Sequence, residues 1–99
     1  MEKKVIDTIR HCFSSQPVAK AWLFGSYSRG EETKDSDIDI LVEFDRSGKP
    51  VTLLTYARLW RTLQEKLNRK VDLVEEGTLK PFAAASVDHD KVLIYERKD

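Results

Sequence analysis

Apolar residues recur at helical spacing in two stretches of the chain. Near the N-terminus, Val5, Ile9 and Phe13 alternate with charged residues, which predicts an amphipathic helix over residues 2–13 that ends before Pro17. Later in the chain, one stripe with the same spacing is formed by Leu53, Tyr56, Ala57, Trp60, Leu63 and Leu67. This stripe predicts the main long helix, over residues 51–70.

Four shorter apolar runs are bounded by turn residues and are typical of β-strands. They cover residues 18–24, 37–44, 70–76 and 91–97. Residues 78–90 show neither pattern clearly, and we expect a loop with a helical turn there. The order helix, strand, strand, helix, strand, strand predicts an α+β fold, with helices packed on a small mixed β-sheet.

Length and composition restrict the class of protein. The 99 residues are expected to form a single domain, 1–99. Basic and acidic residues balance at 17 each, which disfavours a protein that coats nucleic acid, because such proteins need a surplus of positive charge. Cys12 is the only cysteine, so an intrachain disulfide and a cysteine-based metal site are excluded.

The chain carries no sequence signal for a membrane or for export. Charges interrupt its first residues, which therefore lack the apolar region of a signal peptide. No apolar run approaches the ~20 residues that a membrane span requires. We expect a cytoplasmic protein.

Acidic residues interrupt two of the predicted strands. Side chains alternate across a strand, so Asp37 and Asp39 point to one face, ~7 Å apart along the strand, while Ile38 and Ile40 point to the other. Asp72 lies in a similar apolar context in the strand 70–76. If the two strands are neighbours, the three carboxylates converge. Two divalent ions could then be held ~3.5–4 Å apart, and Mg²⁺ favours such carboxylates together with phosphate oxygens.

A glycine and a serine follow the first predicted strand. Gly25 would let backbone amides approach an anion, and the Ser26 hydroxyl adds a donor, which is typical of a phosphate-binding loop. Arg29 could contribute positive charge to the same phosphate. Ser36 directly precedes Asp37 and is a further candidate for nucleotide binding.

The segment GSYSRGEETKDSDIDILV resembles the nucleotidyltransferase superfamily that includes DNA polymerase β. It is most similar to the minimal members of that superfamily, the MNT domains. Their motif is matched by Gly25, Ser26, Arg29, Gly30, Ser36, Asp37, Asp39 and the later Asp72. The resemblance covers most of the chain and implies a polymerase β palm-like fold.

The resemblance also implies an activity and a partner. It implies a Mg²⁺-dependent enzyme that transfers AMP from ATP to a hydroxyl group and releases pyrophosphate. Asp37, Asp39 and Asp72 would bind two metal ions, and Asp72 would also deprotonate the acceptor. MNT domains commonly act as antitoxins of helical HEPN proteins, so the expected acceptor is a HEPN-type protein. Assembly into a homo-oligomer is compatible with this role.

Simpler interpretations of the same residues stay open at this point. The aspartates could lie on a solvated strand edge, and Ser26 or Ser36 could cap a helix or a turn. Arg29 could form an ion pair with Asp37 or Asp39. The domain could instead occlude a HEPN partner without catalysis, or it could modify a small antibiotic such as an aminoglycoside.

Overall fold

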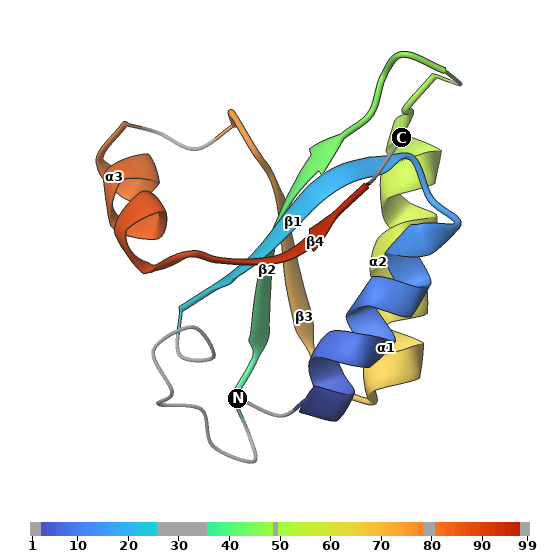
Figure 1. Ribbon diagram of the computed structural model, residues 1–99, viewed down its shortest axis with the longest axis horizontal. Coiled ribbons are helices and arrows are strands. Elements are labelled where there is room, and N and C mark those ends of the chain that lie inside the picture. Colours follow the sequence, from blue (N-terminus) through green and yellow to red (C-terminus); the bar gives the residue numbers. More distant parts are fainter. Residues whose placement is uncertain (1–2, 26–35, 49, 79–80, 98–99) are drawn as a thin grey trace.

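The structure, a computed structural model, describes residues 3–25, 36–48, 50–78 and 81–97. These ranges contain helices and strands in the predicted order, with one additional helix near the C-terminal end (Figure 1). The elements are α1 (Lys3–Ser14), β1 (Val18–Phe24), β2 (Ile38–Phe44), α2 (Leu53–Leu67), β3 (Val71–Glu75), α3 (Pro81–Asp90) and β4 (Val92–Glu96). None of these helices is long and apolar enough to cross a membrane.

The strands form one mixed sheet with the order β3-β2-β1-β4. β1 is antiparallel to both of its neighbours, β2 and β4. β2 and β3 are parallel, and α2 provides the crossover connection that such a pair requires. The predicted α+β class and mixed sheet are therefore confirmed.

One face of the sheet packs against α1 and α2. Ile38, Ile40 and Val42 of β2 are fully buried on this face, as the alternation along the strand predicts. The helices contribute the fully buried Phe13 and Leu63, among others, to the same core. Figure 1 shows α3 away from these two helices, on the other side of the strands. The face that carries Asp39 is thus turned away from the helix layer.

The core side of α2 differs from the predicted stripe. The fully buried residues of this helix are Leu59 and Leu63. Leu53 is 83% exposed and Trp60 is 39% exposed, although both belong to the predicted stripe. The helix begins at Leu53, after the N-cap Thr52, so Leu53 lies in its first turn. The sheet covers the face centred on Leu59 and Leu63 and leaves that first turn open.

The prediction of a loop with only a helical turn at 78–90 was wrong. The structure has a helix of 10 residues there, α3, which begins at Pro81. Proline is favourable at the first helical position, because its fixed φ suits the helix and its missing N–H would have no intrahelical partner. The alanines that follow also favour a helix. The apolar residues of this segment do not fall along one face, which is why periodicity did not reveal the helix.

Candidate active site

Asp39 and Asp72 lie directly opposite each other in the parallel pair of β2 and β3. Adjacent strands are ~4.8 Å apart, and opposed residues of a parallel pair point to the same face. The neighbours Ile38 and Leu73 are buried against the helices, so both carboxylates point to the other face. Asp39 is half-buried and Asp72 is exposed. The fold therefore brings together two acidic residues that are 33 positions apart in the chain.

Asp37 lies just before β2, which begins at Ile38 and not at Asp37 as predicted. The N–H of Ile38 donates a hydrogen bond of 3.0 Å to the carbonyl oxygen of Lys70. This bond ties the start of β2 to the segment that precedes β3. Asp37 is exposed beside this junction, next to Ser36, which is half-buried.

Gly25 follows β1 and lies against the carboxylate of Asp39. Phe24, the last residue of β1, is opposite Asp39 in the antiparallel pair. Gly25 has a φ of +70°, a conformation that favours glycine. A Cβ atom at this position would be 2.2 Å from Oδ2 of Asp39, far closer than atoms can approach. The glycine is therefore required both for the backbone turn and for the position of the carboxylate.

Two predicted site residues, Ser26 and Arg29, lie outside the described residues, as does Gly30 of the motif. Their roles in binding phosphate stay predictions. Gly25 and Ser36 flank this part of the chain. Gly25 is the last residue of the described segment that contains β1, and Ser36 is the first residue of the segment that contains β2.

Tyr56 of α2 is close to the acidic residues, and the sequence pattern assigned it only to the apolar stripe. Its hydroxyl donates a hydrogen bond to the carbonyl oxygen of Leu73, the residue after Asp72. Burial raises the pKa of the Tyr56 hydroxyl, and the negative charges of Asp72 and Glu75 raise it further. Tyr56 is therefore a neutral hydrogen-bond donor beside β3.

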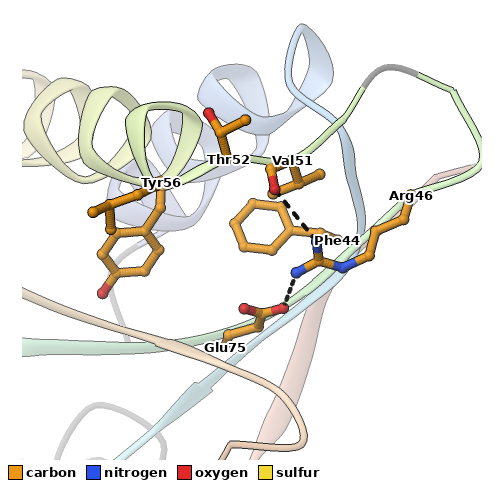
Figure 2. A pocket seen from close by; sticks show the side chains of 7 residues that line it. Phe44, Arg46, Val51, Thr52, Tyr56 and Glu75 are labelled. Carbon is orange, nitrogen blue, oxygen red and sulfur yellow. Dashed lines mark hydrogen bonds and ion pairs between the residues drawn. The ribbon is translucent and has the colours of Figure 1, made fainter.

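A separate cavity of about 340 Å³ lies at the opposite end of β2 from Asp39 (Figure 2). Phe44 and Val51 provide apolar walls, and Tyr56 forms part of the lining. Arg46 forms an ion pair with Glu75 and donates a hydrogen bond of 3.4 Å to the carbonyl oxygen of Val51. These contacts join the end of β2 to β3 and to the start of α2, so they support the fold around this end of the sheet.

The residues of the candidate site fit a divalent ion that is held together with a nucleotide. Among the described residues, no three acidic, histidine or cysteine side chains come close enough to hold a metal ion by themselves. Mg²⁺ is usually bound by one or two carboxylates, with phosphate oxygens and waters completing the octahedron. The opposed pair Asp39 and Asp72 supplies such carboxylates. Gly25 lies directly against the carboxylate of Asp39, at the end of β1.

Residues 3–95 match the nucleotidyltransferase domain family. The chain belongs to this family. A curated candidate protein adenylyltransferase of Methanocaldococcus jannaschii is 41% identical over 73 residues, which are 73% of this chain and 72% of the relative. The protein adenylyltransferase MntA of Thermococcus cleftensis is 39% identical over 77 residues, which are 78% of this chain and 75% of the relative.

Solved structures have the same fold. The structure of a candidate minimal nucleotidyltransferase is 31% identical, with a TM-score of 0.75, and the match covers 91% of this chain and 89% of the other. A toxin–antitoxin structure with AMP-PNP is 23% identical, with a TM-score of 0.76 and coverage of 94% and 74%. A tri-AMPylated HEPN toxin of Shewanella oneidensis in complex with its MNT antitoxin gives 21% identity, a TM-score of 0.72 and coverage of 98% and 74%.

These comparisons bear on the family, the fold and the class of enzyme. The predicted membership of the minimal nucleotidyltransferases and the polymerase β palm-like fold are confirmed. The chain is a nucleotidyltransferase whose relatives are protein adenylyltransferases, which confirms the predicted class of enzyme. The predicted kinds of ligand and partner, an ATP-type nucleotide and a HEPN protein, occur in solved structures of this fold.

Proposed function

We propose that this protein transfers AMP from ATP to a hydroxyl group of a protein partner and releases pyrophosphate. The observation that carries the proposal is the direct opposition of Asp39 and Asp72 on the face of the sheet turned away from α1 and α2, with Gly25 against Asp39. A site that holds a triphosphate beside two carboxylates suits phosphoryl-type transfer, in which positioning and charge stabilisation provide most of the catalysis.

The nucleotide is held at the end of β1. The backbone at Gly25 can approach a phosphate closely, and Ser26, Arg29 and Ser36 provide hydroxyl groups and positive charge for the same triphosphate. Asp37, Asp39 and Asp72 are the residues that would hold magnesium, with two ions as the expected complement. Bound magnesium supplies positive charge that offsets the charge of the phosphates and of the leaving pyrophosphate.

In the transfer step, Asp72 acts as the general base. The oxygen of the acceptor hydroxyl forms a bond to the α-phosphorus of ATP, and the bond from that phosphorus to the bridging oxygen of pyrophosphate breaks. Asp72 accepts the proton of the hydroxyl as the new bond forms. Its exposed position on β3 leaves it accessible to an acceptor that approaches from solvent.

The acceptor is proposed to be a helical HEPN-type toxin, with this protein as the antitoxin. Support comes from the protein adenylyltransferases at 39–41% identity and from the MNT–HEPN complex of the same fold. A tyrosine hydroxyl is the preferred target. The HEPN partner would provide the docking surface that presents its hydroxyl group, and the transferase would hold the nucleotide and the ions.

The test is the intact mass of a HEPN-type partner after incubation with the protein, ATP and Mg²⁺. We expect one or more added AMP units with the wild-type protein and none with Asp39→Asn, which keeps the shape of the side chain but removes its charge. A partner that binds tightly but stays unmodified would reject the proposal in favour of occlusion. Labelling of a free aminoglycoside in its place would assign the chain to antibiotic modification.

A further inference from the structure

Asp72 is carried by β3, which lies at one edge of the sheet and has a neighbouring strand, β2, on one side only. The backbone groups of successive residues in a strand point to opposite edges. Lys70 and Glu76 bond to β2, so by alternation the backbone groups of Asp72 also face β2. The groups of Val71 and Leu73, on either side of Asp72, face outward, where none of the described strands pairs with them.

Three side chains of α2 form hydrogen bonds with these outward-facing backbone groups. Gln64 Oε1 accepts a hydrogen bond of 3.2 Å from the N–H of Val71. Trp60 Nε1 donates a bond of 2.8 Å to the carbonyl oxygen of Val71. The Tyr56 hydroxyl donates to the carbonyl oxygen of Leu73. All three bonds are partly buried. Together they satisfy backbone groups on both sides of Asp72 that a further strand would otherwise pair.

The spacing of the three side chains allows one face of α2 to provide all three bonds. Positions 56, 60 and 64 are each four residues apart, so they lie along one face of the helix. The helix is fixed at both ends, by the capping box of Thr52 and Thr55 and by the left-handed C-cap residue Asn68. A capped helix of 15 residues thus serves as the outer support of β3.

We propose that Tyr56, Trp60 and Gln64 are positioning residues, which hold β3 in register so that the carboxylate of Asp72 faces Asp39 at the distance that transfer requires. The inference rests on the proposed function, because it concerns the geometry of that same site. None of the three side chains needs to touch the substrates. They act through the backbone of Val71 and Leu73.

Small displacements of β3 have large consequences for such a site. A shift of 1 Å in a reacting group can reduce the rate by about 10²-fold. Without the outer bonds, the part of β3 around Asp72 is held by β2 and by the side chains of Val71 and Leu73 in the core, and the ion pair of Arg46 with Glu75 holds the far end of the strand. Removal of the bonds should therefore lower the turnover of bound ATP and leave ATP binding largely unchanged, because most of the residues proposed to bind the triphosphate and the ions lie outside β3.

The test uses the full chain with two substitutions that keep size and remove one bond each, Tyr56→Phe and Gln64→Met. We expect about a 10-fold fall in kcat for each and about 100-fold for the pair, with the KM for ATP within about twofold of wild type. Gln64→Glu, which retains an acceptor oxygen at the same place, should recover most of the kcat lost in Gln64→Met.

The matched control lies at the opposite edge of the sheet. Arg10 Nε of α1 donates a hydrogen bond of 2.6 Å to the carbonyl oxygen of Ile94 in β4, which is the same kind of support on a strand without acidic site residues. Arg10→Met should therefore lower the melting temperature without lowering kcat. An equal fall in kcat for Arg10→Met and Tyr56→Phe would overturn the proposal.

Amide hydrogen exchange provides a readout that does not depend on activity. The amides of Asp72 and Val74, which face β2, should exchange faster in the double variant, with little change in β1 and β2. Unchanged exchange in β3 would overturn the proposal even if the wild type transfers no AMP. Absence of transfer by the wild type would reject the proposed function, whereas normal kcat in the double variant would reject only the positioning role.

Discussion

Gly25 and Asp39 are packed so closely that no other residue type fits at position 25 without displacing the carboxylate. The distance from a Cβ at Gly25 to Oδ2 of Asp39 would be 2.2 Å, and the φ of Gly25 is +70°. The strain of a left-handed backbone and the steric conflict with a site carboxylate are thus two separate penalties. They can be separated by experiment, because the chain contains a second glycine with only one of them.

We predict that Gly25→Ala abolishes AMP transfer and that Gly77→Ala does not. Gly77 also has a positive φ, +91°, but a Cβ there would meet nothing within 4 Å. Both variants should lose about 1–2 kcal/mol of unfolding free energy through backbone strain. Only Gly25→Ala should also move Asp39. Urea denaturation together with a transfer assay checks this, and full activity in Gly25→Ala would contradict the assigned site.

A second prediction concerns stabilisation by Mg²⁺ and ATP together. A ligand at 100 times its dissociation constant adds about 2.7 kcal/mol to the folded state, which a thermal melt resolves easily. ATP with a chelator, or Mg²⁺ alone, should give a smaller shift. Asp37→Asn and Asp39→Asn should remove the combined effect and retain the fold. Equal shifts with and without Mg²⁺ would rule out an ion shared by the carboxylates and the phosphates.

The strand pattern was predictable because alternation is a local property. The strand 18–24 was predicted with the bounds that β1 has, and the burial of Ile38 and Ile40 opposite Asp39 followed from the period of two. Asp39 and Asp72 could converge only if β2 and β3 were neighbours in the sheet. The helical segment between them is typical of a parallel crossover, and the structure has that connection.

The supports of the site could not be predicted from the sequence. Tyr56 and Trp60 belong to an apolar stripe by spacing, yet in the structure each uses its polar atom to bond the outer edge of β3. Which residues of α2 face the core depends on how the helix is rotated over the sheet. A rotation by a fraction of a turn exchanges Trp60, which is 39% exposed, for the fully buried Leu59, and periodicity alone does not fix it.

The placement of α2 on the sheet leads to a third prediction, for two leucines of this helix. Leu59 is fully buried and Leu53 is 83% exposed. Leu59→Ala should cost about 2–5 kcal/mol of unfolding free energy, because it leaves a cavity in the core. Leu53→Ala should change this free energy by less than about 0.5 kcal/mol. Denaturant titration of both variants is sufficient, and similar losses would show that α2 is rotated differently.

The last prediction concerns acid stability and Asp45, which follows β2. The carboxylate of Asp45 accepts hydrogen bonds from the hydroxyl and the N–H of Ser47, and it forms an ion pair of 3.1 Å with Arg97. The hydrogen bond from the Ser47 hydroxyl is the main cause that lowers the pKa of Asp45, and the N–H of Ser47 and Arg97 lower it further.

Because the pKa of Asp45 is lower in the folded state than in the unfolded chain, the ionised carboxylate stabilises the fold. That stabilisation is fully present above the unfolded pKa, about 3.9, and is lost as the pH falls through the lower folded pKa. The wild type should therefore lose more stability than Asp45→Asn between pH 5 and pH 2 in denaturant titrations, and Ser47→Ala should lie between them. Identical pH dependence in the wild type and Asp45→Asn would contradict this stabilising role of the Asp45 carboxylate.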